Sequence, residues 1–426
     1  MNRIWKFSAI LISAVMLLST PVYATGTSPE TMSFQRLTLG LEPDLNYART
    51  PQESRIIIDK EGYIPSAKKV FYIQADSLSQ SFSIVNDKNG EEVFEGNMIK
   101  IEGTDTTEPL YVGDFSSIYT EGTYRIYQED VGYSDSFEID SDIYKDITKQ
   151  VLDDIENNRF TYLSDKMSVL LTLLMTKEIY SSMSIDSEYF KMCMDQLVTY
   201  KDTCTPQEAA IMAGVFAEYC SIYKEDDYMY YNTLLGNANS LYIIAETAEE
   251  DAHPADDVMY FSAATLYRVT GYAKYNQAIE KYDSVSQNQR STSEYDYTML
   301  ADIAYLKTAY PTDYTRCEVI FNKYVDRASE ISALADRAHY YVQPDIDKLN
   351  DSQILDNMMV LGMVSYVLSS HEYASIQGNY LHYLFGVNPS RCNHLKEVID
   401  DEENTVAEDM IMLSKLIFVL GGTSVE

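Results

Sequence analysis

The chain has 426 residues, which is enough for two domains with buried cores. Its 66 Asp and Glu residues outnumber 32 Lys and Arg residues and leave a formal net charge of −34. This sign argues against binding of nucleic acid or of anionic membranes, because both depend on clustered basic side chains. Hydrophobic residues make up 46% of the chain, which is typical of a globular protein and not of a disordered one.

Residues 1–24 are predicted to be a signal peptide. Arg3 and Lys6 form a basic start, and an apolar run covers residues 7–18. Val22 and Ala24 then supply small residues at the −3 and −1 positions of a cleavage site. A membrane anchor is the alternative, but about 12 apolar residues fall short of the roughly 20 that span a bilayer. We therefore expect a secreted, extracellular product with no membrane attachment after cleavage.

An immunoglobulin-like domain is predicted for residues 55–140. Residues 25–54 show no clear period and are interpreted as a leader or linker. From residue 55 onward, short β-rich runs alternate with turn signals, among them Asn89-Gly90, which strongly favours a hairpin. Seven or eight short strands in about 85 residues indicate a β-sandwich of immunoglobulin type. No Cys precedes Cys193, so a disulfide cannot join the two sheets.

Residues 142–422 carry a helical pattern. Met167, Leu170, Leu171 and Leu174 illustrate it with the spacing i, i+3, i+4, i+7. About twelve such segments can pair as six hairpins closed into an (α/α)6 barrel, whereas an open solenoid would need a fixed repeat that is not found. The expected fold class is therefore multidomain, a β-sandwich plus an all-α part: an N-terminal immunoglobulin-like domain followed by an (α/α)6 barrel.

One helix of the barrel is predicted to be enclosed on all sides. Nine of the eleven residues from 410 to 420 are apolar, which leaves no solvent face wide enough for a peripheral helix. Gly421 and Gly422 follow and favour a helix end there.

The cysteines and histidines form no metal-binding pattern. There is no C-x-x-C or H-E-x-x-H spacing, so we expect no metal and no cofactor. The cysteines lie in apolar, helical stretches and are interpreted as buried structural thiols. They are Cys193, Cys204, Cys220, Cys317 and Cys392.

Tyrosine is unusually abundant. The chain has 37 Tyr, and its single Trp, Trp5, lies in the predicted signal peptide. Pairs such as Tyr295 and Tyr297 could be platforms for sugar rings, or packing residues with a hydroxyl at the rim. Their helical spacing favours packing. Asp256 and Asp257 precede a helix and are interpreted as capping residues in preference to catalytic acids.

Several motifs in order along the chain resemble glycoside hydrolase family 9, the cellulases with an N-terminal immunoglobulin-like domain. Residues 58–65 resemble the family's opening strand and Gly-Tyr-x-Pro turn, with Asp59 where Asn is usual. Residues 263–271 look like its central helix pair, and residues 383–389 are similar to its Tyr-x-Leu-Gly-x-Asn-Pro segment. The resemblance implies β-glucan metabolism and hydrolysis of glycosidic bonds. Three further marks of the sandwich lie at residues 114–116, 122–125 and 136–139.

The catalytic motifs of the family are not reproduced here. The family's base lies in an Asp-Ala-Gly-Asp-Tyr loop that has no counterpart, and Asp165 is the carboxylate left near its position. The family's acid is the Glu of an Asn-Glu-Val-Ala segment, where this chain has Thr405. A hydroxyl of such high pKa cannot protonate a glycosidic oxygen at neutral pH. Asp165, Glu403 and Glu408 remain as vestigial catalytic candidates.

A sugar-binding remnant is expected beside these positions. The family's sugar-binding loop after Pro389 is shortened, but Asn388, Arg391 and His394 are present. Tyr162 lies three residues before Asp165, the remaining candidate for the base. We expect these four residues to be the carbohydrate-binding set.

Three functions follow from these observations. The first is a secreted family 9-like protein that no longer hydrolyses glycans and binds a β-glucan, another oligosaccharide or a protein partner. The second is an active glycosidase that uses Asp165 with Glu403 or Glu408. The third is a helical scaffold for protein contacts. A groove of Tyr and carboxylates at one barrel end would favour the first two, and a filled barrel mouth the third. We expect no measurable hydrolysis of β-1,4-glucan.

Overall fold

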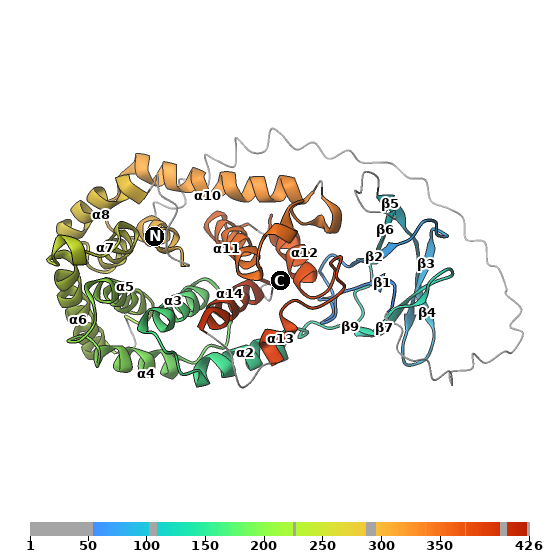
Figure 1. Ribbon diagram of the computed structural model, residues 1–426, viewed down its shortest axis with the longest axis horizontal. Helices are drawn as coiled ribbons and strands as arrows, with labels where there is room; N and C mark the ends of the chain where they lie inside the picture. The colour runs from blue at the N-terminus through green and yellow to red at the C-terminus, as the bar shows by residue number, and fades with distance from the viewer. Residues whose placement is uncertain are drawn as a thin grey trace, which may run out of the picture. The chain divides into compact units, whose positions relative to one another are not determined.

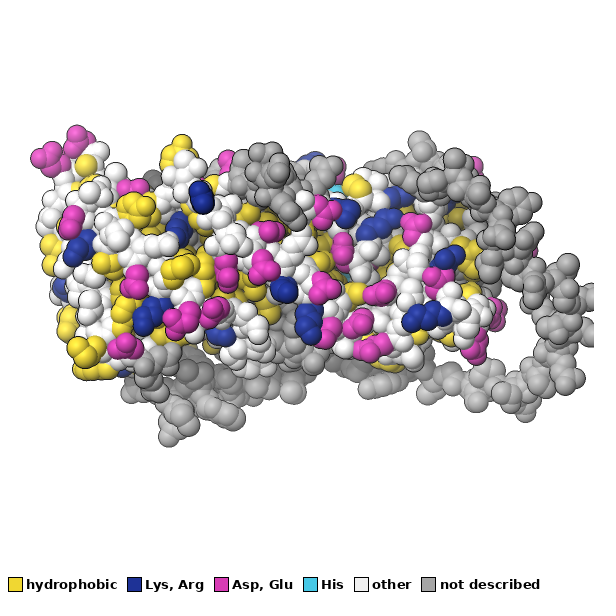
Figure 2. Space-filling model, turned by 90° about the horizontal axis from the view of Figure 1, so that it is seen from below, with side chains coloured by type: hydrophobic (Ala, Val, Ile, Leu, Met, Phe, Trp, Pro, Cys, Tyr) yellow, Lys and Arg dark blue, Asp and Glu magenta, His cyan; other side chains and the backbone are white. Residues whose placement is uncertain are grey.

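The computed structural model describes residues 54–423, without 102–108, 225–226, 287–294, 337, 371 and 401–406 (Figure 1). The predicted signal peptide, the predicted leader up to residue 53, Glu403 and Thr405 therefore lie outside the described residues. On the face shown in Figure 2, Asp and Glu side chains are interspersed with Lys and Arg. Among the described residues no helix is long and apolar enough to cross a membrane.

The N-terminal part is a sandwich of two antiparallel sheets, as predicted. Within the described residues, one sheet has the order β1-β2-β6-β5 and the other β4-β3-β7-β8, with β9 paired to β7. In the first sheet Val70 pairs with Asp114, and in the second Ser83 pairs with Tyr127. The strands are β1 (Ile56–Ile57), β2 (Val70–Gln74), β3 (Ser81–Asn86), β4 (Glu92–Asn97), β5 (Ile99–Ile101), β6 (Leu110–Asp114), β7 (Gly122–Gln128), β8 (Gly132–Tyr133) and β9 (Phe137–Ile139).

Alternation along β2 separates two cores. Phe71 and Ile73 point between the sheets, where they pack with side chains such as Phe82 and Phe115. Val70 and Tyr72 point to the other face and pack with Val387 of the helical part. The sandwich is thus fixed to the barrel by the outer face of its first sheet.

The helical part forms two concentric layers (Figure 1). The inner helices are α3 (Leu163–Ile179), α5 (Pro206–Ile222), α7 (Asp256–Thr270), α9 (Tyr297–Lys307), α11 (Asp351–Leu368) and α14 (Ala407–Thr423). The outer helices are α2 (Lys145–Asn157), α4 (Ser187–Val198), α6 (Tyr228–Glu246), α8 (Ala273–Ser286), α10 (Tyr314–Ala335) and α12 (Ala374–Leu384), and α13 (Lys396–Asp400) is a short helix before α14.

The ring is closed. Each inner helix from α3 to α9 packs on the next, α11 packs on α14, and α14 packs back on α3. Between α9 and α11, Lys307 Nζ lies 4.8 Å from the centre of the Tyr366 ring. This closure confirms the (α/α)6 barrel and excludes an open solenoid. The prediction for residues 410–420 is confirmed, because every side chain of this stretch is buried.

Local signals explain where the inner helices begin. At α5, the Thr205 Oγ1 accepts a hydrogen bond from the Glu208 N–H (3.2 Å), and the Thr205 N–H donates to the Glu208 carboxylate (2.8 Å). Pro206 occupies the first helical position, where its missing N–H costs nothing. At α7, Ala255 precedes the helix, and Asp256 and Asp257 lie in its first turn. These two acids therefore interact favourably with the positive end of the helix dipole, but the N-cap residue is Ala255 and not either acid.

A charge cluster ties the C-terminal ends of four inner helices together. Arg268 of α7 forms ion pairs with Glu178 of α3 and with Glu218 of α5, and Lys307 of α9 also pairs with Glu178. The four side chains expose only 11–17% of their surface. Two cations and two carboxylates make the cluster formally neutral, which is the condition for keeping charges away from water.

A second buried pair joins the sandwich to the barrel. His382 Nδ1 of α12 lies 2.6 Å from Asp59 Oδ2, and both side chains are almost fully buried. Asp59 Oδ1 also accepts hydrogen bonds from the N–H groups of Glu61 (2.8 Å) and Gly62 (3.1 Å). Next to the pair, the Lys60 N–H donates to the Phe385 carbonyl (2.8 Å). Burial raises the pKa of Asp59, and its hydrogen bond to His382 opposes this rise.

Candidate functional site

The candidate site lies at the N-terminal ends of the inner helices. Outer helices run back between successive inner helices, so the inner helices are parallel and their N-termini meet at one end, here called the barrel mouth. The partial positive charges of these helix ends favour acidic side chains. Asp165, Asp257 and Asp351 lie in the first turns of α3, α7 and α11.

Asp165 is a partly exposed carboxylate in the first turn of α3. Its Oδ1 accepts a hydrogen bond from the Ser164 hydroxyl (3.2 Å). Glu408 lies in the first turn of α14 and is exposed. Within the described residues, no hydrogen bond or ion pair joins Asp165 to Glu408 or to another acid. Asp165 is thus an acid at a helix N-terminus, and a catalytic role for either residue stays a prediction.

Two tyrosines cross the axis of the barrel at this mouth. Tyr295 and Tyr297, at the start of α9, reach α3, which lies three positions away in the ring of six inner helices. The hydroxyl of Tyr295 is 2.8 Å from Thr172 Oγ1, and that of Tyr297 is 3.4 Å from Ser168 Oγ. Only 6% and 3% of their surfaces are exposed. A sugar ring could occupy the axis only by displacing them, so the packing interpretation of this Tyr pair fits the structure.

Carboxylates surround the tyrosine pair. Burial raises the pKa of Tyr297 to about 12, and the charges of Asp257 and Asp165 act in the same direction. Burial also raises the pKa of Tyr295, with a contribution from Asp356. Both phenols are therefore neutral at physiological pH and act as hydrogen-bonding, not charged, groups.

A buried lysine next to the mouth was not predicted as a site residue. Lys415 of α14 is almost fully buried, and its Nζ lies 2.7 Å from Asp356 Oδ1 and 2.9 Å from Ser352 Oγ, both of α11. Burial raises the pKa of Asp356, and the charge of Lys415 opposes this rise. The sequence signal for Lys415 is its place within the apolar run 410–420, where a charge requires a partner.

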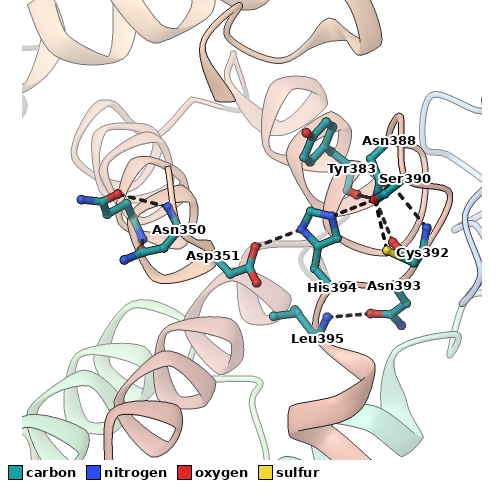
Figure 3. Close-up of polar contacts among 10 residues, drawn as sticks. Asn350, Asp351, Tyr383, Asn388, Ser390, Cys392, Asn393, His394 and Leu395 are labelled. Atoms are coloured by element: carbon teal, nitrogen blue, oxygen red, sulfur yellow. Dashed lines mark hydrogen bonds and ion pairs between the residues drawn. The ribbon is translucent and has the colours of Figure 1, made fainter. Parts of the chain in front are cut away.

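Residues 388–394 form a compact loop between α12 and α13 (Figure 3). Asn388 is fully buried, and its Nδ2 donates to the carbonyls of Tyr383 (2.7 Å) and Cys392 (2.8 Å). Its Oδ1 accepts from the Ser390 hydroxyl (2.7 Å). The Asn388 amide therefore fixes the shape of the loop, and a contact with sugar stays a prediction.

His394 closes this loop against the barrel. Its Nδ1 lies 3.0 Å from Asp351 Oδ1, its Nε2 lies 3.4 Å from Ser390 Oγ, and its backbone N–H donates to the Leu384 carbonyl (2.8 Å). Figure 3 shows the imidazole between the Asp351 carboxylate on one side and the Ser390 hydroxyl on the other. The imidazole and the carboxylate are each about one-quarter exposed, so a ligand can reach them.

The other predicted sugar-binding residues are placed separately. Arg391 is half-buried in the same loop and has a left-handed backbone (φ 58°). Burial raises the pKa of Tyr340, and the charge of Arg391 opposes this rise. Tyr162 directly precedes α3 and exposes 67% of its surface. In the described part of the chain, no contact joins Tyr162 to the loop, whereas Asn388 and His394 are brought together through Ser390.

The cysteines are only partly as predicted. Cys193 and Cys220 are buried, Cys204 and Cys317 are half-buried, and all are free thiols. The prediction is wrong for Cys392, which is exposed because it lies in the loop and not in a helix. Its Sγ is 3.1 Å from Ser390 Oγ. Among the described residues, no group of three or more His, Cys, Asp or Glu could hold a metal ion.

Two family models match the chain. The cellulase N-terminal ig-like domain matches residues 51–133, and glycosyl hydrolase family 9 matches residues 160–398. Endoglucanase D of Acetivibrio thermocellus is 31% identical over 144 residues, which are 34% of this chain and 20% of that protein. A second Endoglucanase D sequence of this species is 34% identical over 100 residues, 24% of this chain and 16% of that protein. The match thus spans at most a fifth of these relatives.

Solved structures of endoglucanases share the fold. A thermostable endoglucanase from Alicyclobacillus acidocaldarius has a TM-score of 0.68 at 14% identity and covers 88% of this chain and all of its own. AaCel9A in complex with cellobiose-like isofagomine has a TM-score of 0.69 at 14% identity, with 87% of this chain and 100% of that chain covered. At this identity the likeness shows the architecture of both parts of the chain.

Proposed function

This chain belongs to glycosyl hydrolase family 9, and from that premise we propose that it is a secreted, non-catalytic member that binds a β-glucan or a related oligosaccharide. The observation that carries the non-catalytic part of the proposal is the pair Tyr295 and Tyr297 across the barrel axis, with both hydroxyls already in hydrogen-bonding contact with Thr172 and Ser168. A site for hydrolysis at the axis needs space for a sugar ring and for a water molecule.

The distribution of acids supports the same proposal. An inverting glycosidase needs a base and an acid roughly 6.5–9.5 Å apart, on opposite sides of the sugar. Asp165 is held at its helix N-terminus by Ser164, and Glu408 is an exposed residue in the first turn of α14. Neither lies in the buried, apolar environment that a catalytic acid of this kind requires.

The rim of the mouth offers a binding surface in place of a catalytic one. Arg391 provides hydrogen-bond donors, His394 provides a ring nitrogen that can accept a hydrogen bond, and Tyr162 provides an exposed aromatic face for stacking on a sugar. The likeness to AaCel9A, whose complex contains a cellobiose-like compound, supports a short β-linked glucan as the ligand.

A second candidate function is a scaffold for protein contacts, and the filled mouth favours it. If the axis is closed, large exposed side chains elsewhere remain for a partner. Tyr228, Met229 and Tyr314 expose 71%, 81% and 59% of their surfaces. The experiment below distinguishes a glycan from a protein ligand.

The test measures turnover and binding separately. We expect no reducing-sugar release from cellulose, xyloglucan or mixed-linkage glucan, by the wild type or by Asp165→Ala. Cello-oligosaccharides should raise the melting temperature of the wild type, and less that of Arg391→Ala or Tyr162→Ala. The matched control is Tyr314→Ala, an exposed tyrosine away from the mouth. Turnover that Asp165→Ala abolishes would establish an active glycosidase. Neither turnover nor a shift with any glucan would leave the protein-scaffold function.

A further inference from the structure

Ser390, His394 and Asp351 lie in line, and this arrangement is here called the Ser-His-Asp cluster (Figure 3). Ser390 Oγ is 3.4 Å from His394 Nε2, and His394 Nδ1 is 3.0 Å from Asp351 Oδ1. We propose that this cluster is an acyl-transfer site at which Ser390 attacks a carboxylic ester. The proposal goes beyond glycan binding, because it assigns a reaction to residues at the rim of the barrel mouth.

The base and its orienting carboxylate are held by separate, rigid elements. Asp351 is the first residue of α11, whose start is fixed by reciprocal hydrogen bonds between Asn350 and Gln353 (3.1 and 2.9 Å). His394 is fixed by its backbone hydrogen bond to Leu384 and by the edge of the Tyr383 ring, 5.7 Å between centroids. The backbone of His394 and one edge of its imidazole are therefore both held in place.

The carboxylate selects the tautomer that a general base needs. Asp351 is an acceptor only, so the hydrogen of the neutral imidazole lies on Nδ1 and donates to Asp351. Nε2 then carries the lone pair and faces Ser390. This is the role of the third member in hydrolases that use a serine nucleophile.

Asn388 holds the nucleophile in a resting orientation. Its Nδ2 donates to two carbonyls, so its Oδ1 must face Ser390, and the Ser390 hydroxyl donates to it at 2.7 Å. A hydroxyl hydrogen rotates freely, and one rotation moves it from Asn388 Oδ1 to His394 Nε2. The longer distance to Nε2 is typical of sites without substrate, where such contacts shorten on binding.

The reaction balances with water as the only co-reactant. Ser390 Oγ bonds to the ester carbonyl carbon while His394 Nε2 takes the hydroxyl proton. The bond to the leaving alcohol then breaks, the imidazolium returns this proton to the alcohol oxygen, and the acyl group remains on Ser390. Water, deprotonated by the same Nε2, attacks the acyl-serine. The bond from the acyl carbon to Ser390 Oγ then breaks, and the imidazolium returns its proton to Oγ, which releases the carboxylic acid and restores the Ser390 hydroxyl.

The substrate class is a carboxylic ester that is presented to an exposed loop. Ser390 is exposed, so the acyl group does not need to enter a deep pocket. An acyl ester on a glycan hydroxyl fits the site. This choice of a glycan as the alcohol part of the ester rests on the proposed glycan binding, whereas the esterase activity itself does not. The probe p-nitrophenyl acetate carries no glycan, so its hydrolysis tests the cluster independently of that function.

The test combines turnover with covalent labelling of the full chain. We expect hydrolysis of p-nitrophenyl acetate to fall about 10²–10⁴-fold in Ser390→Ala and in His394→Ala. Phenylmethylsulfonyl fluoride should add one sulfonyl group to the wild type, on the peptide that contains Ser390. His253→Ala is the matched control, because a surface imidazole can hydrolyse this ester by itself. Circular dichroism melting checks that each variant is folded.

A readout for Asp351 separates positioning from structure. Asp351→Asn should lower kcat with little change in KM or in melting temperature, because the imidazole loses the carboxylate that orients it. Activity that survives Ser390→Ala, or a label on Cys392, would overturn the assignment. So would a wild-type rate no higher than that of His394→Ala.

Discussion

Replacing Arg268 by Met should strongly destabilise the barrel. Burial alone would raise the pKa of Glu178, but the charges of Arg268 and Lys307 outweigh it and lower this pKa to about 2. Relative to its ordinary value of 4.5, this corresponds to about 3 kcal/mol in favour of the charged form. Exposure of 11–17% leaves little screening by water. Breaking a buried pair on one side costs about 3–5 kcal/mol, and we expect a loss in this range.

The assay is urea unfolding followed by circular dichroism at 222 nm. Arg268→Met/Glu218→Gln should regain part of the loss, since Lys307 still pairs with Glu178 and no carboxylate is left unpaired. Lys348→Met is the matched control, because its pair with Asp345 is 70% exposed on both sides and should leave the midpoint unchanged. If Arg268→Met behaves like Lys348→Met, the cluster does not stabilise the barrel.

The same cluster predicts an acid-sensitive stability. Because the pKa of Glu178 is lowered in the folded state, its contribution is present above pH 4.5 and is lost as the pH falls toward about 2. Burial raises the pKa of Glu218, which acts with the opposite sign. In Glu218→Gln, the free energy of unfolding should therefore fall from pH 5 to pH 2, and Glu178→Gln added to it should flatten this dependence.

Three further substitutions test the packing. Leu416→Asp buries a charge without a partner in α14 and should lower the thermal midpoint strongly, whereas an unchanged midpoint would contradict the inner position of that helix. Asp59→Asn keeps the Oδ1 acceptor for the N–H groups of Glu61 and Gly62, and its amide NH2 can donate to His382 Nδ1. This variant should raise stability at pH 7 but not at pH 3, because the raised pKa of Asp59 means that its contribution to stability is lost as the pH rises. Tyr295→Ala should lower the free energy of unfolding by about 3–5 kcal/mol, whereas Tyr162→Ala should not, because Tyr295 is buried and Tyr162 is exposed. Tyr295→Ala should also still show no glucan hydrolysis. An equal loss of stability in the two variants would contradict the packing of Tyr295 across the axis.

The architecture could be predicted because it depends on local periodicity. The last strand ends at Ile139 and α2 begins at Lys145, close to the predicted change of period near residue 142. The sequence predicts about twelve helices, and the described residues contain one α-helix more, α13 (Lys396–Asp400). At five residues, α13 is too short to show a helical period in the sequence. Burial of residues 410–420 followed from composition alone.

Most of the polar contacts could not be predicted, because their partners are far apart in sequence. Arg268 lies 90 residues from Glu178 and 50 from Glu218, and His394 lies 43 residues from Asp351. Nothing local distinguishes these acids from the many others in a chain with 66 of them. Lys415 is the exception, since a lysine within an apolar helix predicts a nearby carboxylate even when its position is unknown.

The tyrosine pair shows why composition left its function open. A tyrosine face suits a sugar and a protein core equally, so the sequence around Tyr295 and Tyr297 is compatible with both. What decides is the ring order of the helices, which places α3 across the axis from α9. In a glycan site, some polar side chains have the ligand as their hydrogen-bond partner. A buried hydroxyl without any partner costs roughly 1–3 kcal/mol, so a tyrosine hydroxyl that is already paired within the protein does not need a ligand. Here Thr172 and Ser168 supply those partners from within the barrel. The mouth is therefore complete without a ligand, and any ligand must bind at its rim.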